Sequence, residues 1–177
     1  MRYLLSLVLL ILLISSTVNG QTRLQSIERE SLRGLTGVGV LAVLGDGTEN
    51  ETAGITLNQL RADMELRIRK AGIKVLSNEE VKSTPGNPVM VVIVNTSQIT
   101  ELETEVGKIY TVSCLIEFKQ YVALKRNPTI NAIGTTWERQ SFGYLGASKL
   151  RDLKNWVADY VDQFINDFLA MNPHAAP

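Results

Sequence analysis

The stretch IYTVSCLIEFKQYVALKR, residues 109–126, is the longest strand pattern in the chain and decides its fold class. Its even positions, from Tyr110 onward, are mostly apolar, whereas its odd positions include polar residues such as Glu117 and Lys119. Successive side chains of a strand point to opposite faces, so the segment predicts a sheet with one buried and one wetter face. Cys114 falls on the buried face as a small apolar filler, with a reactive or bridging thiol as the alternative.

Other segments supply partners for this strand. Residues 37–45 and 89–96 are apolar on both faces, which is typical of strands that are covered or central in a sheet. Residues 126–128 predict a turn, after which residues 129–144 return as an antiparallel partner. A short strand at residues 73–76 brings the expected total to about five.

Two segments have helical periodicity. Thr56 and Gln59 form a capping-box signature at the start of the first helix, and Gly72 is a good terminator. The apolar stripe of this helix is Leu57, Leu60, Met64, Ile68 and Ala71. The second helix is expected to begin at Ser148 and to reach about Met171. Its apolar stripe is Leu150, Leu153, Val157, Tyr160, Phe164 and Phe168, flanked by Val161 and Ile165.

This β-α-β-β-β-β-α order predicts an α+β two-layer sandwich, a mixed sheet of about five strands with both helices on one face. The first strand–helix–strand unit predicts a right-handed crossover between parallel strands. Residues 77–88 and 99–107 are expected to be polar connections. The chain divides into a signal peptide (1–20), a flexible N-terminal segment with one short helix (21–35), a single domain (36–172) and a tail (173–177).

The first twenty residues, MRYLLSLVLLILLISSTVNG, have the layout of a secretory signal peptide. Arg2 precedes an apolar run at residues 4–14, and small residues lead to a cleavage position between Gly20 and Gln21. The alternative is an uncleaved anchoring helix, although the run is shorter than the roughly 20 residues of a bilayer span. No Cys follows the run, so the usual lipoprotein attachment point is missing. We expect a periplasmic or secreted protein without a membrane span after cleavage.

Composition excludes several classes of chemistry. The formal net charge is +0, and no long basic run offers a footprint for nucleic acid. One Cys and one His exclude an internal disulfide and a multi-His/Cys zinc site. A histidine triad or a Cys–His dyad would need His174 in the tail, and chain ends are usually mobile, which disfavours both. We therefore expect no cofactor and no catalytic residues, although an all-carboxylate cation site stays open.

Two groups of carboxylates are candidates for such a site. Glu101, Glu103 and Glu105 alternate, so in extended chain their oxygens would share one side and could hold calcium. A solvated loop or an edge strand explains the same letters. The loop at residues 46–51 resembles a cation loop only loosely.

Three aromatic residues, Trp137, Phe142 and Tyr144, lie near the end of the last expected strand. They form an aromatic patch for a partner in one interpretation. In the other interpretation they fill the gap between the sheet and the C-terminal helix.

Three phrases resemble a group of small, exported, uncharacterised bacterial proteins: LRADMELRIRKAGIKVLS at residues 60–77, TTW at 135–137 and VDQFINDFLAMNP at 161–173. The order of elements is also similar to envelope-assembly domains, namely the lipoprotein activators of penicillin-binding proteins, the curli secretion lipoprotein and the amino-terminal domain of the Tol propeller protein. The resemblance implies a sheet that docks other proteins. The chain departs from these families in lacking a lipobox and a pore-forming or propeller extension.

The leading hypothesis is an exported, non-catalytic binding or assembly domain of the bacterial cell envelope that acts through protein–protein contact. Its expected partner is another envelope protein, and the residues that bind it are unknown. The alternatives are a carboxylate- or cation-dependent hydrolase, and a carrier of a small apolar ligand between sheet and helix beside Val157 and Phe164.

Overall fold

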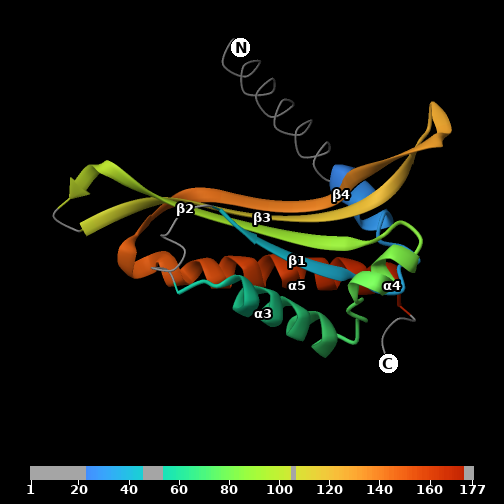
Figure 1. The fold of residues 1–177 in the computed structure, drawn as a ribbon, viewed down its shortest axis with the longest axis horizontal. Helices are drawn as coiled ribbons and strands as arrows, with labels where there is room; N and C mark the ends of the chain where they lie inside the picture. Colours follow the sequence, from blue (N-terminus) through green and yellow to red (C-terminus); the bar gives the residue numbers. More distant parts are fainter. Residues whose placement is uncertain (1–22, 46–53, 105–106, 174–177) are drawn as a thin grey trace, which may run out of the picture.

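A computed structural model describes residues 23–45, 54–104 and 107–173. Figure 1 shows a layer of long strands that run roughly along the direction of α5, with α5 and α3 beneath them. The elements are β1 (Gly39–Leu44), α3 (Leu57–Lys70), α4 (Asn78–Ser83), β2 (Val89–Thr104), β3 (Gly107–Leu124), β4 (Asn127–Gly146), a 3₁₀ helix (Ala147–Asp152) and α5 (Leu153–Met171).

The expected α+β two-layer sandwich is confirmed, with a sheet of four strands in the order β1-β2-β3-β4. β1 pairs in parallel with β2, while β2, β3 and β4 pair antiparallel. The prediction of about five strands is wrong by one, because residues 73–76 form only the isolated parallel bridge between Val38 and Val75. Ser77 immediately caps α4, so the chain turns away before a ladder can extend.

One face of the sheet carries the core, and α3 and α5 both pack on that face (Figure 1). The predicted alternation of β3 is confirmed, since Tyr110, Cys114 and Phe118 are all buried. The ring of Phe164 on α5 lies 5.1 Å from that of Phe118 and 5.3 Å from that of Trp137. These contacts join the long helix to the two antiparallel strands.

The first helix begins as expected, because the Thr56 hydroxyl accepts a hydrogen bond from the Gln59 amide at its N-terminus. Leu60, Met64 and Ile68 of the predicted stripe are buried. Leu57 departs from the prediction, since 46% of its surface is exposed. Gly72 has the positive φ of 79° that a left-handed terminator requires.

Three expected boundaries are wrong. Residues 77–88 contain α4, whose capping box joins Ser77 and Glu80. Residues 99–104 are not a loop, because β2 continues to Thr104, which pairs with Gly107 at the start of β3. The C-terminal helix is not capped at Ser148: a 3₁₀ helix comes first, and its three residues per turn direct both Leu150 and Leu153 into the core.

The segment expected to be flexible with one short helix, residues 21–35, includes a helix at residues 23–30. Just after that helix, Leu32 is completely buried. Gly20 and Gln21, the loop at 46–51, Glu105 and His174 lie outside the described residues. Within the described ranges, no helix combines the length and apolar character of a transmembrane span.

Candidate functional site

The face of the sheet turned away from α3 and α5, which we call the open face, carries the odd positions of β3. Strand register continues this face across the sheet, since Val43 lies beside Ile93, which lies beside Leu115. Large apolar residues on the open face would normally be covered, yet six of them are exposed. They are Leu41, Val43, Tyr121, Ile133, Phe142 and Tyr144.

Phe142 and Tyr144 are the most prominent members of this surface. Their rings lie 5.8 Å apart at 73°, and the residues are 68% and 64% exposed. Their partners in the β3 register are the small polar residues Ser113 and Thr111, which leave space beside the two rings. Because an aromatic pair holds its shape with few rotatable bonds, it is well suited to contact another surface.

The third predicted aromatic residue, Trp137, has the opposite orientation. Its ring is completely buried on the helix side, where its Nε1 donates a 2.9 Å hydrogen bond to Asp167 on α5. The structure therefore separates the predicted group: Trp137 fills the gap between sheet and helix, whereas Phe142 and Tyr144 form an exposed patch. Position along the strand is the signal that could have separated them. Trp137 has an odd number and Phe142 and Tyr144 have even numbers, so in a strand they point to opposite faces.

The α4 end of the open face is hollowed. A hollow of about 270 Å³ is lined by Val91, Tyr121 and Ile133 among other residues. Val81 of α4 overlies Gly39 here so closely that a Cβ at position 39 would lie 2.6 Å from its methyl carbon. This end of the face thus combines an apolar depression with two exposed apolar side chains.

Charged residues of the open face gather in its middle. Glu117 and Lys119 form a 3.0 Å ion pair, and Glu138 lies opposite Glu117 in the register. The rows that carry Thr111 and Ser113, next to the aromatic pair, contain no charge. The aromatic end therefore has little desolvation cost to oppose an apolar partner.

The predicted carboxylate groups lie mostly outside the described residues, whereas the predicted thiol is described. Glu101 and Glu103 lie in β2, two positions apart in a strand rather than in a loop, and their side chains lie outside the description. Among the described residues, no three His, Cys, Asp or Glu side chains are close enough to hold a metal ion. Burial raises the pKa of the Cys114 thiol to about 12, as expected of the predicted apolar filler.

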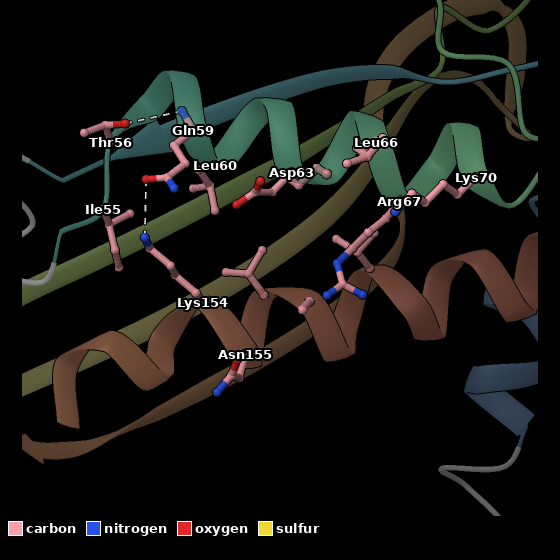
Figure 2. A pocket seen from close by; sticks show the side chains of 14 residues that line it. Ile55, Thr56, Gln59, Leu60, Asp63, Leu66, Arg67, Lys70, Lys154 and Asn155 are labelled. Carbon is pink, nitrogen blue, oxygen red and sulfur yellow. Dashed lines mark hydrogen bonds between the residues drawn. The ribbon is translucent and has the colours of Figure 1, made fainter.

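A second concave surface lies between α3 and α5 (Figure 2). This groove has a volume of about 440 Å³ and includes Leu60 and Val157 in its lining. Lys154 reaches across it from α5 and donates a 3.3 Å hydrogen bond to the Gln59 side-chain oxygen. The hollow beside Val157 is thus between two helices, whereas Phe164, the other residue of the predicted ligand space, is packed among aromatic rings.

A polar network around Asp167 was not predicted. Besides accepting the Trp137 hydrogen bond, the Asp167 carboxylate forms an ion pair of 2.6 Å with Arg29 and a longer one with Arg139. Arg139 also pairs with Glu28 at 2.8 Å and places its guanidinium 4.5 Å from the centre of the Trp137 ring. These contacts attach the helix at residues 23–30 to the outer edge of β4.

The fold and this site define a small two-layer α+β domain with one covered and one open sheet face. No family model matches the chain, and no curated protein matches it. One solved structure with a similar chain is the rare lipoprotein B from Shewanella oneidensis. The two share 16% identity over 75% of this chain and 91% of that chain, with a TM-score of 0.29. This is a loose likeness, from which no function follows.

Proposed function

We propose that this protein is an exported, non-catalytic binding domain of the bacterial cell envelope that docks another protein on its open face. One observation supports docking: Phe142 and Tyr144 are about two-thirds exposed, in ring contact, on the same face as four other exposed apolar residues. Export is what the signal-peptide pattern of residues 1–20 predicts. The partner that this surface fits is a protein with a flat apolar patch and an uncharged margin.

The size of the exposed surface supports a docking role. A buried aromatic side chain covers about 150–250 Å². At two-thirds exposure, Phe142 and Tyr144 together leave about 200–330 Å² in water. These two rings alone reach the lower part of the range of about 300–600 Å² for the largest contiguous patches on monomers, which are often functional.

The proposal is tested by recovering partners from envelope extracts by crosslinking and mass spectrometry. Phe142→Ser combined with Tyr144→Ser should remove the specific partner, because both anchors are lost. The matched control is Ile130→Ser, which changes an exposed apolar residue near the start of β4, far along the strand from Phe142, and should leave recovery unchanged. Equal recovery with the double variant and with the unaltered protein would refute docking on the open face.

The groove between α3 and α5 favours one second candidate function, the binding of a small apolar ligand. Its volume of about 440 Å³ is within the range of small-molecule sites. Ala158→Phe should fill the groove and weaken binding of an anilinonaphthalene sulfonate probe several-fold. Ala170→Phe makes the same change at an exposed position of α5 outside the groove and should not. Equal probe binding by both variants would remove this candidate.

A further inference from the structure

The two outer edges of the sheet, on β4 and on β1, differ in whether their outward backbone N–H and C=O groups have hydrogen-bond partners among the described residues. On β4, three successive outward carbonyls are occupied by side chains. The Thr136 carbonyl accepts from the Ser31 hydroxyl at 3.1 Å, and the Gln140 carbonyl accepts from the Tyr160 hydroxyl at 3.0 Å. The Glu138 carbonyl between them accepts from the Arg139 guanidinium. This part of the β4 edge is therefore closed to another strand.

On β1, alternate residues direct their backbone to opposite sides. The Gly39 amide donates to the Pro88 carbonyl and the Gly45 amide to the Val94 carbonyl, so odd positions face β2. At Val38 the amide and carbonyl face the other way and are paired with residues 74 and 76. By this alternation, the N–H and C=O groups of Val40, Ala42 and Leu44 point away from the sheet. The hydrogen bonds of the described residues provide no partner for them.

The side chains along this edge are apolar on both faces. Leu41 and Val43 are exposed on the open face, while Val40, Ala42 and Leu44 point toward α3. On α3, Leu57 belongs to the sheet-facing stripe but is the stripe residue that remains exposed. Because α3 packs against β1, a strand added beside β1 would lie over the sheet-facing side of this helix.

We propose that the outer edge of β1 is a strand-addition site, which takes an extended segment of about five uncharged, apolar-rich residues from a partner protein. The backbone of the segment would pair with Val40, Ala42 and Leu44, and its alternate side chains would extend the core and the open face. The strand-addition site rests on the proposed function in one respect only: both assume that the partner is a protein. A second copy of the chain is less suitable, because antiparallel pairing of two β1 strands would bring two α3 helices closer than the 8–10 Å that packed helices need.

The test uses the purified protein and a synthetic probe, a peptide that copies residues 89–94 with two added lysines for solubility. Amide hydrogen exchange should show fast exchange at Val40, Ala42 and Leu44 and slower exchange at Leu41 and Val43. Saturating peptide should slow exchange at the three outward amides at least tenfold. Unchanged exchange at these amides, or protection of β4 instead, would overturn the proposal. Protection that grows with protein concentration alone would also overturn it, in favour of self-association.

A matched pair of proline variants separates edge pairing from general damage. Ala42→Pro removes an outward N–H from β1 without touching the β1–β2 ladder, and should abolish peptide protection. Gln140→Pro makes the same change on the closed β4 edge and should leave it intact. Should Ala42→Pro unfold, Leu41→Lys with Val43→Lys changes only exposed side chains and should weaken peptide binding at least tenfold. Retained protection in these β1 variants would refute the site.

The open-face proposal and this one can fail separately. Phe142→Ser with Tyr144→Ser should lose the partner in extracts but keep the peptide protection of β1. If the same double variant instead lost the peptide protection of β1 and kept the partner, the peptide would depend on the open face. That result would reject strand addition at β1.

Discussion

The contrast between Phe164 and Phe142 offers a sharp test of which face of the sheet is core. Phe164 is completely buried, and its ring contacts those of Phe118, Trp137 and Phe168 at 5.1, 5.3 and 6.1 Å. Phe164→Ala should therefore lower the free energy of unfolding by about 3–5 kcal/mol, since it leaves a cavity at the centre of this cluster. Phe142→Ala should change it by no more than about 0.5 kcal/mol, because its ring is mostly in water.

Thermal and urea unfolding, followed by circular dichroism, measure both effects. For a domain of this size, 1 kcal/mol corresponds to about 2–4 °C in Tm, so Phe164→Ala should lower Tm by about 6–20 °C. Phe142→Ala should lower it by no more than about 2 °C. Phe164→Leu, which keeps most of the volume, supplies an intermediate variant if the alanine variant does not fold. Similar losses for Phe164→Ala and Phe142→Ala would refute the assignment of buried and open faces.

Further predictions concern the buried groups and one turn. Asp167→Ala should cost about 1.5–3 kcal/mol in urea unfolding, because it leaves the buried Trp137 N–H without an acceptor. Asp162→Ala, which breaks an exposed ion pair, should cost under about 1 kcal/mol, and equal costs would contradict this. Cys114 should resist a thiol reagent at pH 8 until the protein unfolds. Since burial raises its pKa from 9.0 to about 12, its contribution to stability is complete below pH 9 and lost as pH rises from 9 to 12; rapid native labelling would refute this. Gly72→Ala should destabilise by about 1 kcal/mol because of its positive φ, and an unchanged urea midpoint would contradict that strain.

Much of the fold could be predicted because its signals are local. The alternation in residues 109–126 identifies the buried face of β3, and the Leu60, Met64 and Ile68 stripe identifies the core side of α3. Both patterns depend on neighbours two to four positions apart, which a single segment contains.

Boundaries were predicted less well where polar residues occur inside regular structure. Residues 99–104 continue β2 although they are rich in Glu and Thr, because after a register shift Glu103 and Thr104 pair with Lys108 and Gly107 of β3, which composition does not reveal. Conversely, residues 73–76 are apolar but form only one bridge, because Ser77 and Glu80 begin a helix directly after them. Tertiary context overrides local propensity in both places.

For the candidate site, the sequence identified Phe142 and Tyr144 but grouped them with Trp137. It did not identify Leu41, Val43, Tyr121 or Ile133 as exposed. Exposure of a strand residue depends on which face the helices cover, and the residues of one strand do not contain that information.

By itself, the sequence determined the periodicity of the long strands, the helices α3 and α5 and the α+β class, and it favoured a buried, apolar role for Cys114. Only the tertiary structure decided that α3 and α5 cover the same sheet face, that side chains occupy carbonyls along the β4 edge, and that Asp167 contacts both Trp137 and Arg29. The physical reason is separation along the chain. Trp137 and Asp167 are 30 positions apart and Arg139 and Glu28 are 111 apart, so their contacts exist only after the strands and helices have packed.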